Sequence, residues 1–104
     1  MMHIDIFKAL SNETRLEILR WLKEPKQHFD NPPGKDPENI DEKGGVCVGV
    51  IQKKAQLSQS TTSQYLSMMQ KAGLLKAERK GKWTYYRRNE KTIQDVSEYI
   101  KEEL

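Results

Sequence analysis

The chain has 104 residues, of which 36% are hydrophobic and 32% are charged. This length suits one domain, and the low hydrophobic share is typical of a soluble, surface-rich fold that can rely on a partner subunit. No apolar run approaches the roughly 18 residues that a membrane-spanning helix needs. The N-terminal segment lacks the basic start and apolar core of a secretory signal. Because a single cysteine cannot form an internal disulfide, we expect a cytoplasmic protein.

The net charge of +3 is unevenly distributed along the chain. Residues 52–88 hold nine Lys and Arg against the single acid Glu78, a net charge of +8. The flanking segments 24–51 and 89–104 each have a net charge of −3, and residues 1–23 have +1. A concentrated basic block of this kind is typical of a surface that binds a polyanion such as nucleic acid.

Two short helices are predicted at the N-terminal end. Residues 4–10 place Ile4, Phe7 and Leu10 three apart, which is helical spacing. Ser11 or Asn12 can cap a second helix, which Pro25 ends. The apolar face of that second helix consists of Leu16, Ile18, Leu19, Trp21 and Leu22.

Residues 24–45 predict a loop, because they hold all four prolines and three of the six glycines with few apolar anchors. A loop this long in a small domain is either a tolerated surface insertion or a functional or mobile segment. The sequence favours the tolerated insertion.

The second half of the chain predicts helix, turn, helix, hairpin and helix in that order. A short helix is expected over 46–55, and Ser58 can cap the next over 59–72, which Gly73 stops. The segments on either side of Gly81–Lys82 read as a two-stranded β-hairpin. A terminal amphipathic helix follows, with its apolar stripe at Ile93, Val96, Ile100 and Leu104. The fold class is therefore mainly α with a two-stranded hairpin, a winged helix-turn-helix over residues 1–104.

The helix over 59–72 has an unusual exposed face. At about 100° per residue, the core side receives Thr62, Tyr65, Leu66, Met68, Met69 and Ala72. The opposite side has no carboxylate, and consists of Gln59, Ser60, Ser63, Gln64, Ser67, Gln70 and Lys71. Thr61 stands at the third helical position, where an acid often completes a capping box. Short hydroxyl side chains and glutamines without acids suit phosphate and base-edge contacts in a major groove.

The hairpin adds a second basic feature. Arg79, Lys80 and Lys82 cluster at its tip, where they can reach phosphates or a minor groove. Trp83, Tyr85 and Tyr86 follow on the second strand, so at least one ring is expected to pack inward. A base-stacking platform for single strands is the less favoured interpretation.

Three segments together resemble the ArsR/SmtB family of bacterial winged-helix repressors: "FKALSNETRLEILRWL", "LSQSTTSQYLSMMQKAGLL" and "ERKGKWTYYRRN". The resemblance covers about 75 of the 104 residues, leaving out 24–45 and the divergent last helix. It implies a homodimer that binds an inverted-repeat DNA operator and releases it when an inducer is sensed.

The resemblance also assigns residues to roles. Groove contacts fall on Gln59, Ser60, Thr61, Ser63 and Gln64, and wing contacts on Arg79, Lys80 and Lys82. Lys71, the one charged residue of the acid-free face, joins the DNA-binding set. The dimer interface would come from the first and last helices, through Ile4, Phe7, Leu10, Ile93, Val96, Ile100 and Leu104.

The departures from the family concern sensing. Metal-sensing relatives carry Cys-Val-Cys-acid where this chain has Cys47-Val48-Gly49-Val50, and their zinc site on the last helix needs histidines that are missing here. One soft ligand cannot hold a metal well, so we expect no metal and no cofactor. Cys47 is either a packed small hydrophobe or, less favoured, a redox-sensitive thiol at a helix start.

No nucleophile–base pair or phosphate-binding glycine loop is present, so the sequence predicts no enzyme. The predicted function is a homodimeric repressor that binds duplex DNA. The alternatives are a repressor switched by Cys47 and a winged-helix module for protein–protein interaction.

Overall fold

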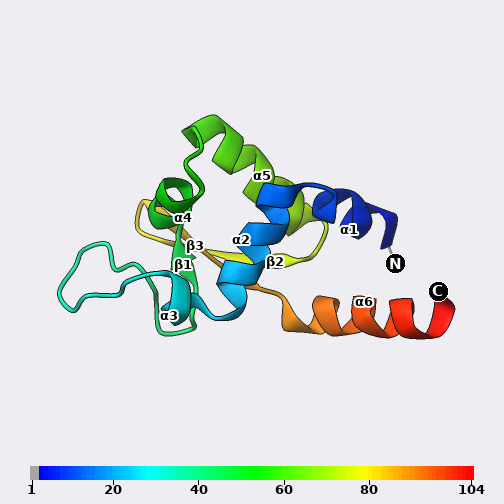
Figure 1. The fold of residues 1–104 in the computed structure, drawn as a ribbon. Coiled ribbons are helices and arrows are strands. Elements are labelled where there is room, and N and C mark those ends of the chain that lie inside the picture. The colour runs from blue at the N-terminus through cyan, green and yellow to red at the C-terminus, as the bar shows by residue number, and fades with distance from the viewer. Residues whose placement is uncertain (1–2) are drawn as a thin grey trace.

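The structure is a computed structural model and describes residues 3–104. These residues form six helices and three strands, and Figure 1 shows how they are arranged. In chain order they are α1 (His3–Leu10), α2 (Glu13–Lys23), α3 (Pro25–His28), β1 (Val46–Cys47), α4 (Val48–Ala55), α5 (Gln59–Lys71), β2 (Leu75–Lys80), β3 (Trp83–Arg88) and α6 (Glu90–Glu103).

The molecule is elongated, with principal extents of 47 × 26 × 23 Å. α6 extends away from the body at one end, where the N-terminal end of α1 also lies (Figure 1). The loop that follows α3 projects from the opposite end (Figure 1). Among residues 3–104, no helix has the length and apolar content that crossing a membrane would require.

The hairpin is confirmed, and it belongs to a larger sheet than predicted. β2 and β3 pair in antiparallel register from Leu75↔Arg88 to Lys80↔Trp83. β1 adds a third strand on the other side of β3, so the sheet order is β1-β3-β2. The expected helix over 46–55 is therefore wrong at its start, because residues 46–47 pair with β3 and the helix begins at Val48. Pairing with a distant strand overrode local helix periodicity there.

The predicted helix ends are largely confirmed, because the capping side chains make their expected hydrogen bonds. The Asn12 side chain caps α2 and the Ser58 hydroxyl caps α5, each accepting from the backbone N–H three residues on. Asn89 caps α6 in the same way. Gly73 has φ of +88°, the left-handed conformation that ends α5.

The core has two parts. The main cluster joins α2, α4, α5 and the sheet through residues such as Ile18, Ile51 and Leu66. A second cluster joins α1 to α6 through Ile6, Ala9, Leu74 and Val96. On α2, the predicted apolar face is too wide, because Leu16 is 43% exposed.

The segment 24–45 is not the simple surface loop that the sequence favoured. Its first residues form α3, with Pro25 at the first helical position rather than only ending α2. Phe29 and Ile40 are buried in the main cluster, and Ile40 forms a β-bridge with Val46. The segment therefore enters the core at both of its ends, and we call it the insertion.

Candidate nucleic-acid interface

The helix-turn-helix consists of α4, a three-residue turn and α5. The turn reverses the chain at Gln56, whose φ of 55° is left-handed. The N–H of Gln56 donates to the carbonyl of Lys53 at 3.2 Å, which closes the end of α4. Ser58 then begins α5 as its cap. This geometry places the first turn of α5 at the surface, at the top of the view in Figure 1.

The exposed face of α5 agrees with the prediction at its polar positions. Thr62, Leu66 and Met69 are buried. Gln59, Ser60, Ser63, Gln64, Gln70 and Lys71 are exposed, and Thr61 and Ser67 are partly exposed. Met68 was predicted to face the core but is 43% exposed, because α1 covers that side of α5 only in part. No residue of α5 is acidic.

Hydroxyl side chains of the first turn of α5 form hydrogen bonds with one another and with the backbone of that turn. The Ser58 hydroxyl accepts from the Thr61 N–H at 3.1 Å and lies 3.0 Å from the Thr61 hydroxyl. The Thr62 hydroxyl donates to the Ser58 carbonyl at 2.8 Å. These bonds hold the helix end without an acid, so its partial positive charge is not neutralised by a carboxylate of its own first turn.

The wing consists of residues 75–88. Its tip is a tight turn at Gly81, whose φ is +64°. The Arg79 side chain donates through Nε to the Gly81 carbonyl at 3.1 Å. Lys82 is exposed at the tip. Within residues 3–104, neither Arg79 nor Lys82 forms an ion pair with an acidic side chain.

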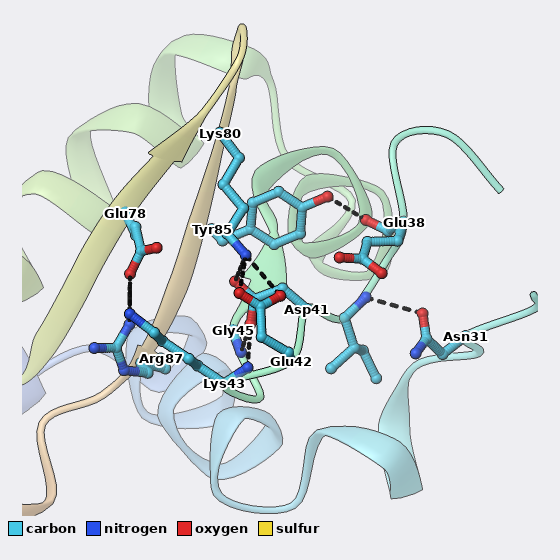
Figure 2. Close-up of polar contacts among 11 residues, drawn as sticks. Asn31, Glu38, Asp41, Glu42, Lys43, Gly45, Glu78, Lys80, Tyr85 and Arg87 are labelled. Atoms are coloured by element: carbon cyan, nitrogen blue, oxygen red, sulfur yellow. Dashed lines mark hydrogen bonds and ion pairs between the residues drawn. The ribbon is translucent and has the colours of Figure 1, made fainter. Parts of the chain in front are cut away.

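Lys80 is placed differently from its two neighbours. Figure 2 shows its ammonium between two carboxylates of the insertion, 2.6 Å from Glu42 Oε1 and 3.2 Å from Asp41 Oδ2. The hydrogen bond to Glu42 is the main cause that raises the pKa of Lys80. The same bond lowers the pKa of the exposed Glu42 carboxyl. Lys80 therefore links the wing to the insertion.

Asp41 organises the tight turn over residues 41–45, which we call the insertion turn. Its Oδ1 accepts from the backbone N–H groups of Lys43 at 2.9 Å and Gly45 at 2.8 Å. Burial alone would raise the pKa of Asp41, but the backbone hydrogen bonds from Gly45 and Lys43 and the adjacent Lys80 ammonium outweigh burial, and the pKa lies below its usual value. The Asp41 side chain is only 1% exposed.

Further contacts tie the wing to the insertion turn and its flanks. Glu78 of β2 forms ion pairs with Lys43 at 3.1 Å and with Arg87 at 3.5 Å (Figure 2). The Tyr85 hydroxyl donates to the Glu38 carbonyl at 2.5 Å. Tyr85 is buried and Tyr86 packs against the main cluster, which confirms the prediction that at least one of the three rings packs inward, while Trp83 is 37% exposed. Burial raises the pKa of Tyr85.

The sequence therefore overstates the free positive charge of residues 52–88. Lys80, Arg87 and Arg88 are paired with acids, and the Lys54 ammonium lies 5.2 Å from the centre of the Trp21 ring. The basic side chains of this block without an ion pair in the described chain are Lys53, Lys54, Lys71, Lys76, Arg79 and Lys82.

The residues predicted for a dimer interface divide into two groups. Val96 is buried against α1 of its own chain, and Phe7, Leu10 and Ile93 pack around the same cluster. Ile4, Ile100 and Leu104 are 60%, 47% and 80% exposed. They lie on α1 and at the C-terminal end of α6, two helices that extend toward the same end of the molecule (Figure 1).

The residues discussed for sensing are not gathered into a cluster. Cys47 is buried at the start of α4, and its N–H donates to the Asn39 carbonyl at 2.9 Å. The ring of His3 stacks on Tyr99 at 3.8 Å, and His28 ends α3. Across residues 3–104, no three His, Cys, Asp or Glu side chains come together in a group that could hold a metal ion.

Sequence reasoning missed the residues that connect these elements. Asp41 and Glu42 lie in the segment that the sequence predicts to be a loop, and their pairing with Lys80 spans 38 residues or more. The one available signal was the acidic 24–51 segment beside a basic block in a small chain. Charge balance alone does not say which residues pair.

Comparisons with known proteins agree with the fold. No protein-family profile matches the chain. It is 52% identical over 101 residues to an uncharacterised HTH-type transcriptional regulator, YbzH, of Bacillus subtilis, covering 97% of both chains. It is 30% identical over 98 residues to the arsenical resistance operon repressor of the same organism, covering 94% of this chain and 73% of the repressor.

Solved structures show the same fold. An ArsR family transcriptional regulator matches with a TM-score of 0.71 at 15% identity, over 97% of this chain and 84% of that one. A homodimeric winged helix-turn-helix DNA-binding domain from Mycobacterium bovis matches with a TM-score of 0.64 at 25% identity, over 91% of this chain and 71% of that one. The chain has the exposed helix and the wing of this fold, and it is similar to these regulators over most of its length. It therefore belongs to the ArsR/SmtB family of winged helix-turn-helix transcriptional regulators.

Proposed function

We propose that this regulator is a homodimeric repressor that binds an inverted-repeat operator, with α5 in the major groove and the wing on adjacent backbone or minor groove. The observation that carries the proposal is the acid-free exposed face of α5 beside the wing tip. Helix-turn-helix proteins read base edges with the N-terminal residues of the second helix. All 104 residues act as one DNA-binding domain in this proposal.

The proposed contacts divide by role. Base edges are read by side chains from the first half of α5, and phosphates are bound by cations at the end of α5 and at the wing tip. The base-reading set is Gln59, Ser60, Thr61, Ser63 and Gln64; the phosphate set is Lys71, Arg79 and Lys82. Lys80 is not in the phosphate set, because its ammonium is paired with two carboxylates.

The dimer of the proposal uses the exposed apolar residues of α1 and α6. Ile4, Ile100 and Leu104 are exposed in the single chain, and a second copy would remove them from water. A two-fold symmetric dimer presents two α5 helices and therefore reads two half-sites about one helical turn of DNA apart.

The proposal is of a cytoplasmic protein without catalysis, cofactor or metal. Burial of Cys47 supports its role as a packed hydrophobe. A thiol switch requires access for an oxidant, which the buried side chain does not offer directly.

The experiment is selection of bound duplexes from a random pool, followed by affinity measurements on the selected sequence. We expect one inverted repeat to be enriched and the affinity to fall steeply with salt. Ser63→Ala and Gln64→Ala should each reduce discrimination between operator and random duplex by about 1 to 2 kcal/mol, as loss of a base contact does.

Matched controls come from α6, where Ser97 and Gln94 are also exposed on a helix. Ser97→Ala and Gln94→Ala should leave discrimination unchanged. Enrichment of no sequence, together with affinity that does not depend on salt, would overturn the proposal and favour a protein–protein interaction module.

A further inference from the structure

Core packing and hydrogen bonds hold the insertion in a fixed position beside the wing. Ile40 is buried in the main cluster and bridges to Val46. The Ile40 N–H donates to Asn31 Oδ1 at 3.1 Å, and the Asn39 amide donates to the Asp30 carbonyl at 2.7 Å. Two backbone hydrogen bonds close the insertion turn: the Asp41 N–H donates to the Gly45 carbonyl at 2.9 Å, and the Gly44 N–H donates to the Asp41 carbonyl at 3.0 Å. The carboxylates that reach Lys80 therefore come from an ordered support.

The charged side chains of β2 point to two opposite faces of the sheet. Successive residues of a strand point to opposite sides. Glu78 and Lys80 both face the insertion turn, where each has a partner of opposite charge (Figure 2). Arg79 lies between them in sequence, points to the other side and bonds only to the wing turn.

Releasing Lys80 from this arrangement is unfavourable. Its ammonium contacts Glu42 at 2.6 and 2.8 Å and Asp41 at 3.2 Å. If it moved to a phosphate, Asp41, with its side chain 1% exposed, would keep a buried negative charge without its cation. An uncompensated buried charge is strongly destabilising.

We propose that the insertion turn withdraws Lys80 from DNA and places the Glu42 carboxylate beside the wing, so that it lowers affinity for duplexes of every sequence and leaves discrimination to α5. The inference rests on the proposed function. In it, Lys80 is a positioning residue that fixes the wing on the insertion, and Arg79 and Lys82 are the wing's phosphate contacts. Glu42, 67% exposed in its side chain, adds a like charge that repels phosphate.

The test compares the salt dependence of duplex binding for Lys80→Gln and Lys82→Gln, which remove the same charge two residues apart. Loss of one phosphate contact lowers the slope of log affinity against log salt by about 1. We expect Lys82→Gln to lower the slope by that amount and Lys80→Gln to leave it unchanged. Lys80→Gln leaves Asp41 without its cation and should lower stability, so circular dichroism and a melting curve fix a temperature at which both variants are folded for the binding measurements.

A second arm removes the repelling charge. Glu42→Gln should tighten binding to random duplex at low salt by roughly two- to threefold, the effect of one unit charge near a phosphate in water. The operator-to-random ratio should stay constant. Glu98→Gln, on the exposed side of α6, is the control and should change neither quantity.

The outcomes separate the two proposals. If the wild-type protein binds duplex and Lys80→Gln lowers the salt slope as much as Lys82→Gln, Lys80 contacts phosphate and the inference is wrong. If Glu42→Gln does not tighten random-duplex binding, the repelling role is wrong. If the wild-type protein shows no salt-dependent duplex binding, the proposed function itself fails first.

Discussion

The guanidinium of Arg15 lies over the Tyr65 ring, with its central carbon 5.0 Å from the ring centre. The same side chain donates from Nε to the Ala9 carbonyl at 2.6 Å and from a terminal nitrogen to the Lys8 carbonyl at 3.2 Å. Arg15 is only 8% exposed. It therefore closes the end of α1 with a positive charge and joins α1 to α5, the helix with the candidate base contacts.

Arg15→Leu removes these charged hydrogen bonds and the contact with the Tyr65 ring. We expect the free energy of unfolding to fall by about 2 kcal/mol, because hydrogen bonds from charged groups contribute more than neutral ones. Urea denaturation followed by circular dichroism measures the change. The control is Arg20→Leu, since Arg20 is 76% exposed and its ion pair with Glu17 at 3.5 Å lies at the surface. That variant should stay within about 0.5 kcal/mol of wild type, and equal losses in both would contradict the role given to Arg15.

The two glycines near α4 and α5 should respond in opposite directions to alanine. Gly73 has φ of +88°, so Gly73→Ala forces a left-handed alanine and should cost about 1 kcal/mol of stability. Gly49 lies within α4, and a Cβ there meets no atom within 4 Å. Gly49→Ala should therefore stabilise the protein by about 0.5 to 1 kcal/mol. Thermal unfolding of both variants is the measurement, and a loss of stability in Gly49→Ala would show that α4 is constrained there.

The insertion turn should make stability sensitive to acid. The folded-state pKa of Asp41 lies below its ordinary value of 3.8, so the ionised carboxylate stabilises the fold at pH values above 3.8. This contribution is lost as the pH falls through the folded pKa. Asp41→Asn keeps an oxygen acceptor for the turn but cannot titrate. We expect the variant to be less stable at neutral pH, and the difference from wild type to shrink as the pH falls below about 4. Urea midpoints across the acid range measure it; a constant difference would mean that the ionised form of Asp41 contributes nothing.

The exposed apolar residues at the ends of α1 and α6 should control dimerisation. Ile100→Ser removes a side chain that is 47% exposed in the single chain and that a partner would cover. We expect the dimer dissociation constant to rise about tenfold, with the helix content unchanged. Sedimentation velocity over a range of concentrations measures it. Leu16→Ser changes a similarly exposed residue, 43%, on α2. It should leave the dimer intact, and equal weakening by both would place the interface elsewhere.

Several features of the candidate site could be read from sequence because they are local. Ser58 caps α5, Thr62 turns inward, and Gln59, Ser60, Ser63 and Gln64 face outward. Each follows from helix periodicity within one or two turns. The hairpin tip is local in the same sense, since the glycine at its turn and the strands on either side lie within 14 residues.

The predictions that the structure corrects concern residues whose surroundings are formed by elements far away in the chain. Val46 and Cys47 became a strand because β3, about 40 residues later, supplies the pairing. Met68 was placed on the core side by its angle on the helix, but α1 does not cover it fully, and it is 43% exposed. Helix angle says which side a residue faces and not whether another element reaches that side.

The sequence by itself determined the family, the order of the helices and the acid-free face of α5, because these depend on neighbouring residues and their spacing. Only the tertiary structure decided where the insertion packs and which lysines of the wing are unpaired. Lys80 and Glu42 are 38 residues apart, and no period or motif relates them. They meet because Phe29 and Ile40 bury the insertion in the core and bring its carboxylates to the Lys80 side chain of β2, where the sequence alone had predicted a cation available to DNA.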